Sequence, residues 1–315
     1  MGPFETITIF GGATVDRIAA TVGSTVLGSS NPGTAHVHPG GVGLNVARGL
    51  ARLGHCVRLV GRIGRDADGD IVMAAARDAG VDMSGVSVSE TAPTASYHAA
   101  FDHQGSLVIG IADMAICDEI TPTEVTAAIA DPPRRSLWLV DANLSAATLD
   151  FIAGAAAEAV VPLAALTVSP AKAIRLSPLL DRLRLFIANR REAAAVLGYD
   201  LDAPMPTATD LARMISEART PNVVISDGGG PLVVGVHGKV RALAPFKAHV
   251  KTVNGGGDGL AAGTIHGLAL GRDLLDAALS GLATAAIAIE SEGTVSADLS
   301  SELVAARIAS GGVTR

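Results

Sequence analysis

Residues 251–270 read KTVNGGGDGLAAGTIHGLAL: a triple glycine, Gly255, Gly256 and Gly257, is followed by Asp258 and an apolar segment. The apolar segment predicts a helix, and the glycines predict a tight turn in front of it. Glycines let backbone N–H groups converge on an anion, and a helix N-terminus adds about half a positive charge. A carboxylate at this position can take a proton from a hydroxyl while the amides hold a phosphoryl group. The stretch therefore predicts phosphoryl transfer to an alcohol, with Asp258 as general base.

A purely structural interpretation of this stretch stays open. Glycine-rich turns are common before helices, and an aspartate in the first turn is favoured by the helix dipole. A carboxylate at its ordinary pKa is also a weak base, so we expect positioning to contribute more than basicity if Asp258 is catalytic. A second glycine cluster near the N-terminus supports the catalytic interpretation.

This second cluster, GGVGLN at residues 40–45, precedes a predicted helix of small and apolar residues that ends near Gly54. A glycine such as Gly41 lets substrate hydroxyls approach the backbone, and the Asn45 amide offers both a donor and an acceptor. The spacing is not G-x-G-x-x-G, and the cluster does not directly follow the first predicted strand. A dinucleotide-dependent oxidoreductase is therefore disfavoured.

Composition and charge narrow the class of protein further. The 315 residues are 49% apolar, which suffices for one large α/β domain or two small ones. Aromatic residues make up 3% of the chain and the formal net charge is −7, so neither base stacking nor a basic surface indicates nucleic-acid binding. We expect a small-molecule substrate and no nucleic-acid partner.

Several features predict a cytoplasmic protein without a membrane partner. Cys56 and Cys117 each lie next to an apolar residue, which is typical of buried thiols in a reducing compartment. The N-terminal residues lack a basic region followed by a long apolar run. Leu274–Ile289 contains Asp276 and several small residues, and it is predicted to be a core helix and not a membrane span.

Strands and helices are predicted to alternate along most of the chain. Thr6–Phe10 is the first predicted strand, and Gly61–Gly69 is predicted to be a loop before a helix at Asp70–Ala79. The further predicted strands are Val57–Val60, Leu137–Val140, Leu163–Val168, Phe186–Ala188, Val223–Ile225 and Leu232–Val236. This alternation predicts a parallel sheet covered on both faces, with ligands bound at the carboxyl ends of its strands.

Two segments, about 13–38 and 94–112, are predicted to form a small lid outside this core. The first is rich in Ser, Gly and Thr and contains the turn signal Ser30–Gly33. The second contains a predicted hairpin in which Thr94–Phe101 and Leu107–Ile111 flank a turn at residues 102–105. Because both segments carry many small and polar residues, we expect them to pair with each other and not within the core.

The ordered set of motifs resembles the ribokinase (phosphofructokinase B) family of sugar and nucleoside kinases. GGVGLN at 40–45 matches the N-terminal signature, and NGGGD at 254–258 is similar to the C-terminal signature usually written TGAGD. Asn189–Glu192 matches the N-x-x-E motif associated with magnesium and phosphate. The resemblance covers essentially the whole chain. It implies one ribokinase-like α/β domain over residues 1–315, a three-layer sandwich with a mainly parallel central sheet and an inserted β-sheet lid.

Within this family the chain is similar to the pseudouridine kinases. The similarity rests on Ser30–Gly33, the G-G-V-G-x-N form of the first signature, Ile111–Met114 and Val140–Ser145. It implies transfer of a phosphoryl group from ATP, with Mg²⁺, to the ribosyl 5′-hydroxyl of pseudouridine. A requirement for K⁺ is left open, and pairing of lid sheets in the family implies a homodimer.

The resemblance assigns roles to individual residues. Asp258 would be the general base, and Gly255, Gly256 and Gly257 would form an anion hole. The acceptor would be bound by residues from both halves of the chain: Asp16, Asn31, Gly41, Asn45, Ser96, Asp113, Met114 and Asn143. The nucleotide would contact Asn189, Ser226 and Gly228, and Mg²⁺ would be organised by Asn189 and Glu192, largely through water because Mg²⁺ dehydrates reluctantly.

Each assignment has a structural alternative. Asp16 could cap a loop, Asn143 could form a turn and Glu192 could be a favourable first-turn carboxylate. The chain also departs from the family pattern at several positions: Leu44 stands in place of the Arg common in pseudouridine kinases, Leu166 in place of an acid, Pro231 in place of a glycine, Asn254 in place of Thr and Gly256 in place of Ala. None of these changes removes the base or the anion hole.

Two alternatives to a pseudouridine kinase remain. One is another sugar or nucleoside kinase of the family, such as a ribokinase, an adenosine kinase or a fructokinase-like enzyme. The other is a sugar or nucleoside sensor that keeps the fold without catalysis, against which the intact Asp258 argues.

Overall fold

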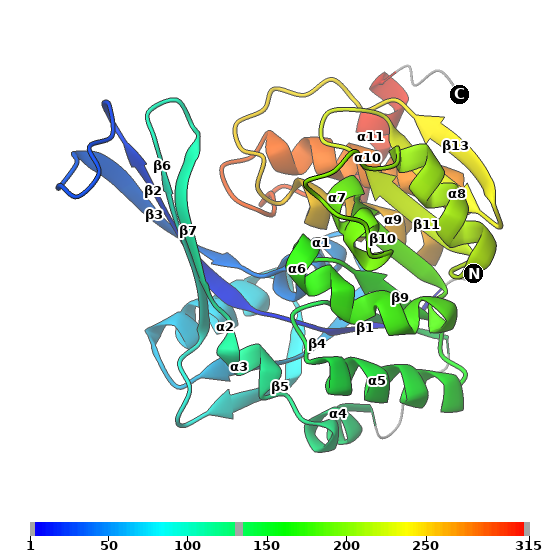
Figure 1. Ribbon diagram of the computed structural model, residues 1–315. Helices are drawn as coiled ribbons and strands as arrows, with labels where there is room; N and C mark the ends of the chain where they lie inside the picture. Colours follow the sequence, from blue (N-terminus) through cyan, green and yellow to red (C-terminus); the bar gives the residue numbers. More distant parts are fainter. Residues whose placement is uncertain (1–3, 130–134, 312–315) are drawn as a thin grey trace.

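Nine strands form the larger of two β-sheets in the computed structural model, which describes residues 4–129 and 135–311 (Figure 1). The strands are β1 (Thr6–Phe10), β4 (Cys56–Gly64), β5 (Asp82–Ser89), β8 (Ser136–Asp141), β9 (Leu163–Leu166), β10 (Leu185–Asn189), β11 (Asn222–Ser226), β12 (Leu232–Val236) and β13 (Lys239–Leu243). Their order across the sheet is β13-β12-β11-β10-β9-β8-β1-β4-β5. Pairing is parallel from β5 to β11 and antiparallel at β12 and β13. The predicted mainly parallel α/β sheet is confirmed.

Helices cover both faces of this sheet, so its central strands are apolar on both sides. One face carries α1 (Val42–Arg52), α2 (Ala67–Ala79), α9 (Gly256–Ala269) and α10 (Leu274–Ile289), with α11 (Ser301–Ser310) packed on α10. The other face carries α4 (Pro122–Ile129), α5 (Ala146–Glu158), α6 (Pro170–Ala173), the 3₁₀ helix η1 (Ile174–Arg182), α7 (Arg190–Val196) and α8 (Ala208–Ala218). The result is a three-layer sandwich with an apolar core on each side of the sheet.

The second sheet has four strands and stands at one side of the sandwich (Figure 1). Its strands are β2 (Thr14–Thr21), β3 (Gly33–Gly40), β6 (Ala95–Phe101) and β7 (Leu107–Asp113), in the order β3-β2-β6-β7. The two segments predicted to form a lid therefore do pair with each other. The short helix α3 (Ala115–Asp118) follows β7 and packs Ile116 and Cys117 against the base of this sheet.

Three predictions about local structure were wrong. The segment 61–69 is not a loop: β4 continues to Gly64, where it pairs with the unpredicted strand β5, and α2 begins at Ala67. Asp66 caps that helix by accepting from the Gly69 N–H, which explains the earlier start. Cys56 is exposed and only Cys117 is buried, because Cys56 is the first residue of its strand.

Leu274–Ile289 is a core helix, as predicted, and most of its residues are buried. In the two described ranges of the chain, no helix is both long and apolar enough to cross a membrane.

Candidate active site

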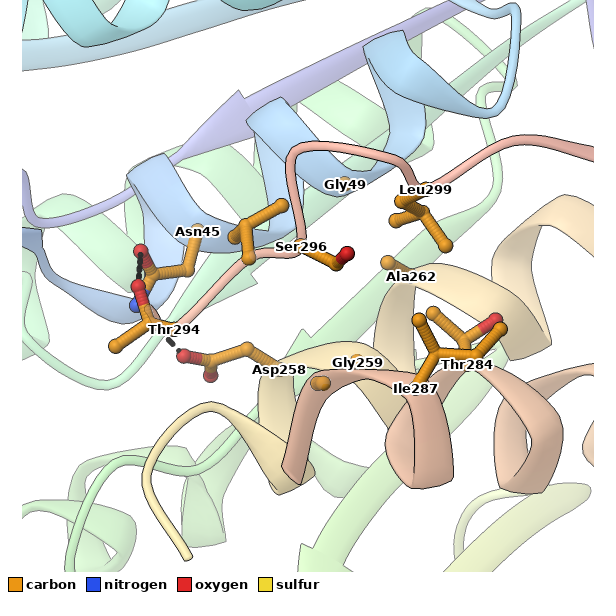
Figure 2. A pocket seen from close by; sticks show the side chains of 12 residues that line it. Asn45, Gly49, Asp258, Gly259, Ala262, Thr284, Ile287, Thr294, Ser296 and Leu299 are labelled. Atoms are coloured by element: carbon orange, nitrogen blue, oxygen red, sulfur yellow. Dashed lines mark hydrogen bonds between the residues drawn. The ribbon is translucent and has the colours of Figure 1, made fainter. Parts of the chain in front are cut away.

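Two helix N-termini meet at the carboxyl edge of the large sheet. Asn45 on α1 donates from Nδ2 to Oδ2 of Asp258 on α9 over 2.9 Å, although the two residues are 213 positions apart. Thr294, in the loop after α10, donates from Oγ1 to Oδ1 of Asn45 over 3.0 Å. Figure 2 shows the Asn45 amide between these two partners. The two glycine motifs of the sequence therefore converge on one site.

The backbone at the start of α9 leaves its first amides available. Gly255 is the N-cap residue, with a φ of 81° in the left-handed region, and no side chain caps the helix. A Cβ on Gly255 would lie 2.2 Å from the carbonyl oxygen of Thr294. Because the first N–H groups of a helix lack intrahelical acceptors, Gly256 and Gly257 can offer theirs to an anion beside Asp258.

Asp258 is a stronger base than an ordinary aspartate. Its side chain is half-buried at the edge of a deep cavity. Burial raises the pKa of Asp258 to about 7, and the charges of Asp141, Asp16 and Glu192 also raise it, whereas the hydrogen bond from Asn45 opposes the shift. A carboxylate with a pKa near neutrality is well matched to general base catalysis. If Asp258 is catalytic, its basicity would add to the positioning expected from the sequence.

Asp141, at the end of β8, holds the N-terminal half of the site together. It is fully buried, and Oδ2 accepts from the backbone N–H groups of Gly12 and Gly43 over 2.9 and 3.0 Å. Asn143 donates to it from its backbone over 2.8 Å and from its side chain over 3.2 Å. Burial raises the pKa of Asp141, and these four hydrogen bonds oppose that rise. The carboxyl group thereby joins the β1 loop, the first turn of α1 and the β8 loop.

Asp16 and Gly41 lie next to this junction. Gly41 has a φ of 91°, and a Cβ there would lie 2.6 Å from the carbonyl oxygen of Gly12. Asp16, on β2, accepts from the Thr14 hydroxyl over 2.9 Å. Burial raises the pKa of Asp16, against the effects of Thr14 and His38. Its neighbour Arg17 points to the other face of the small sheet and pairs with Asp68 of α2 over 2.7 Å, so Asp16 faces the Asp258 side.

Asn143 carries a basic partner. It is buried, and Lys172 of α6 donates from Nζ to its Oδ1 over 2.6 Å. The Asn143 amide thus bridges the Lys172 ammonium and the Asp141 carboxylate. This fixed arrangement places polar groups beside the Gly12 loop, where a Cβ would lie 2.8 Å from the Asn143 amide nitrogen.

On the other side of Asp258 lies a cavity of about 780 Å³. Its lining includes the predicted nucleotide and metal residues Asn189, Glu192, Ser226 and Gly228 together with Gly256, Gly257 and Asp258. Much of the remaining lining is apolar and includes Phe246, Val250, Leu282 and Ile289. A cavity of this size with apolar walls and a few polar groups is typical of a small-molecule site.

Asn189 and Glu192 form a capping box at the start of α7. The Asn189 side chain accepts from the Glu192 N–H over 2.9 Å, and Glu192 Oε2 accepts from the Asn189 N–H over 3.0 Å and from the Thr167 hydroxyl. The structural alternative for Glu192 is therefore realised. Only Oε2 is engaged within the described part of the chain, and Glu192 also lines the cavity.

The donor set suits magnesium bound through water and phosphate. Within residues 4–129 and 135–311, no group of three or more His, Cys, Asp or Glu side chains could form an all-protein metal cage. Mg²⁺ is usually held by one or two carboxylates plus substrate phosphates. Glu192, at the cavity wall near the free amides of α9, meets that requirement.

Four predicted acceptor residues are not gathered at Asp258. Asn31 lies in the β2–β3 connection, where its amide bonds to the backbone of Val26 and Ser29. Ser96 pairs with Val15 on one side and with Asp113 on the other. Because Val15 precedes Asp16 in β2, the side chains of Ser96 and Asp113 lie on the face of the small sheet opposite to Asp16. Met114 packs against the base of that sheet.

Sequence reasoning missed three polar residues of the site. Asp141 lies in the motif Val140–Ser145 at the end of a predicted strand, and this position could have indicated a site residue. Thr167 and Thr294 contact Glu192 and Asn45, but nothing in their local sequence distinguishes them from ordinary loop residues.

The chain belongs to the pfkB family of carbohydrate kinases, because the model of this family matches residues 5–301. It is therefore a phosphotransferase with a hydroxyl acceptor, a sugar or nucleoside kinase of ribokinase-like fold, and the resemblance drawn from the motifs is confirmed. Among curated proteins, it is 29% identical over 258 residues to the pseudouridine kinase of Escherichia coli (strain K12), an alignment that covers 82% of each chain.

Solved structures support the fold. A carbohydrate kinase from Agrobacterium tumefaciens is 33% identical and superposes with a TM-score of 0.83, covering 98% of both chains. Ribokinase from Arabidopsis thaliana, solved with ribose and ATP, is 19% identical with a TM-score of 0.81, covering 98% of this chain and 99% of that one.

Replacing Gly255 by Ala should destabilise the protein by about 1–3 kcal/mol, because alanine is strained at positive φ and its Cβ would meet the Thr294 carbonyl. Gly257→Ala is the matched control, since nothing lies within 4 Å of a Cβ there. It should leave stability unchanged or raise it by up to about 1 kcal/mol, as expected for Gly→Ala in a helix. Urea unfolding of both variants measures the difference, and equal midpoints would contradict the described turn.

Proposed function

We propose that the protein transfers the γ-phosphoryl group of ATP to the ribosyl 5′-hydroxyl of a nucleoside, with pseudouridine as the acceptor and Asp258 as general base. The observation that carries the proposal is the Asn45–Asp258 hydrogen bond at the junction of the two glycine motifs. It supports the proposal because a carboxyl group with a raised pKa then lies between a polar N-terminal site and a large cavity.

The acceptor would bind on the N-terminal side of Asp258. Asp16 and the Asn45 amide can hydrogen-bond sugar hydroxyls, and the conformation of Gly41 lets a hydroxyl approach the backbone. Asn143, held by Asp141 and Lys172, would complete this wall. The face of the small sheet that carries Asp16 supports this role better than the opposite face, which carries Ser96 and Asp113. The contacts of Asn31 within the β2–β3 connection and of Met114 at the base of the small sheet give no support to an acceptor role.

The donor would occupy the 780 Å³ cavity. Its apolar lining suits a nucleobase, and the turn at Ser226–Gly230, in which Gly228 has a φ of 56°, forms part of its wall. Glu192 and Asn189 would organise Mg²⁺ through water, and the bound ion would offset charge on the triphosphate oxygens. A K⁺ requirement stays open, and the cytoplasmic location stays a prediction from the sequence.

Transfer would proceed by a direct displacement at the γ-phosphorus. Asp258 would accept the proton of the 5′-hydroxyl as that oxygen bonds to phosphorus, and the bond to the ADP oxygen would break. The amides of Gly256 and Gly257 would stabilise charge on the transferring group. Closure of the small sheet would exclude water and so suppress hydrolysis of ATP.

The choice of pseudouridine rests on the sequence motifs and on the similarity to the Escherichia coli pseudouridine kinase. Another sugar or nucleoside kinase is the second candidate, favoured by the fold shared with a ribokinase that binds ribose. A non-catalytic sensor is disfavoured because Asp258 is intact and its pKa of about 7 suits a general base, which binding alone does not require.

A panel of acceptors tests the substrate. With ATP and Mg²⁺, we expect kcat/KM for pseudouridine to exceed that for uridine, cytidine, adenosine, ribose and fructose by at least about tenfold, since a site that bonds a polar group rejects analogues lacking it. A coupled assay that monitors ADP formation measures each rate. If the enzyme prefers ribose or fructose, it is a sugar kinase and the nucleoside assignment is wrong. If no acceptor is phosphorylated, the sensor is favoured.

Asp258→Asn tests the base. The variant should lose about 10²–10⁴-fold in kcat, the usual contribution of a positioned acid or base, and should still bind ATP. In the unmodified enzyme, kcat/KM should fall as pH drops below about 7, because protonated Asp258 cannot accept a proton. Asp258 would not be the base if the kcat of Asp258→Asn lay within threefold of the unmodified enzyme. The same conclusion would follow if kcat/KM of the unmodified enzyme were constant from pH 5.5 to 8.5.

The small sheet would also form a homodimer. Its face opposite Asp16 exposes Val37, Leu107, Ile109 and Ile111 by 52–56% each. In the row across this face, Val37 on β3 and Ile111 on β7 lie on either side of Arg17 and His98. Exposed apolar patches of this kind mark association sites, and a second copy would bury the same face by two-fold symmetry.

Ile111→Lys should convert the dimer to a monomer, because a lysine there would bury an unpaired charge in the proposed interface. Leu270→Lys is the control, since Leu270 is 54% exposed at the end of α9, away from the small sheet. Sedimentation velocity at micromolar concentration gives the mass of each variant. A monomeric unmodified protein, or a dimeric Ile111→Lys variant, would refute this interface.

A further inference from the structure

Two arginines, Arg190 and Arg191, line the donor cavity from the first turn of α7, and they differ in their partners. The Arg190 guanidinium donates from Nε to the Pro206 carbonyl over 2.9 Å and from Nη2 to the Met205 carbonyl over 3.1 Å. Its Nη1 atom lies 3.4 Å from Asp227 Oδ2. The Arg190 guanidinium is therefore already bound to the loop before α8 and to the turn after β11.

Arg191 differs from Arg190 in its contacts. Its side chain is exposed and lines the cavity, and within the described residues it has neither a hydrogen bond nor an ion pair. A cation in the first turn of a helix is also disfavoured by the helix dipole. Arg191 therefore contributes nothing evident to the stability of the fold, and its guanidinium is free to bind a ligand.

The charge of the cavity lining shows why such a group is needed. Glu192, Asp227 and Asp258 are the acidic lining residues, against two arginines, so the lining carries no net positive charge whether Asp258 is protonated or ionised. A nucleoside triphosphate is a polyanion, and the carboxyl groups of this lining disfavour its binding. The free amides of α9 and a bound Mg²⁺ offset part of that repulsion.

We propose that Arg191 binds the phosphate chain of the nucleoside triphosphate donor. The inference rests on the proposed function for the identity of the donor. A guanidinium can donate two parallel hydrogen bonds to phosphate oxygens, which gives stronger and more directional binding than an ammonium. The amides of Gly256 and Gly257 approach the chain from α9, and Arg191 approaches it from α7.

Arg191→Gln is the test, with Arg184→Gln as the matched control. Arg184 is exposed and directly precedes β10, whereas Arg191 follows that strand, and Arg184 does not line the cavity. Calorimetric titration without acceptor gives the Kd of each variant for ATP, ADP and adenosine in the presence of Mg²⁺. Steady-state kinetics gives KM for ATP and for the acceptor.

In Arg191→Gln, Kd and KM for ATP should rise by about 10- to 100-fold, as expected for the loss of charge-assisted hydrogen bonds. The Kd for adenosine and the KM for the acceptor should change by less than about twofold, and the melting temperature should not fall. Arg191→Lys should give an intermediate loss of ATP affinity, because lysine keeps the charge but cannot donate two parallel hydrogen bonds. Arg184→Gln should bind ATP like the unmodified protein.

An ATP affinity of Arg191→Gln within twofold of the unmodified protein would overturn the inference. An equal loss for adenosine would also overturn it, because the contact would then not be to phosphate. If Arg191→Gln does not fold, Arg191→Lys decides alone, and unchanged ATP binding in that variant refutes a bidentate contact. Failure of the proposed acceptor would appear separately, as absence of nucleoside phosphorylation in the unmodified protein with ATP binding still dependent on Arg191.

Discussion

The buried carboxyl group of Asp141 is the contact on which the geometry of this kinase site depends. An uncompensated carboxylate in the interior would be strongly unfavourable, and Asp141 is tolerated because Gly12, Gly43 and Asn143 direct four N–H donors at it. These donors come from three segments that are distant in the chain. Their shared acceptor fixes the start of α1, and Asn45, two residues after Gly43, is thereby aimed at Asp258.

Burial also sets the chemistry of Asp258. Desolvation outweighs the hydrogen bond from Asn45 and, with three neighbouring carboxyl groups, brings the pKa of Asp258 to about 7. The same acidic surroundings disfavour a polyanionic donor, and in the proposed function the α9 amides, a metal ion and the Arg191 guanidinium would offset them. Without the clustered carboxyl groups, the pKa of Asp258 would be lower.

Features encoded in short, contiguous patterns were predictable from the sequence. The glycine motifs at 40–45 and 254–258 indicated Asn45 and Asp258, and strand–helix alternation indicated the parallel sheet. Features that depend on convergence were not predictable: the donors to Asp141 come from three separate segments, and Thr294 lies in a loop without a pattern. Strand β5 was missed because small and polar residues interrupt its apolar positions. No local signal separates Arg190 from Arg191, since the partners of Arg190 lie at 205–206 and 227.

A crystal structure with pseudouridine and a non-hydrolysable ATP analogue tests the central claim most directly, by locating both substrates relative to Asp258. The account predicts that the 5′-oxygen lies within about 3.2 Å of an Asp258 carboxylate oxygen, with the γ-phosphorus beside the Gly256 and Gly257 amides. It would be contradicted by a nucleoside bound away from Asn45, or by a triphosphate outside the cavity between α7 and α9.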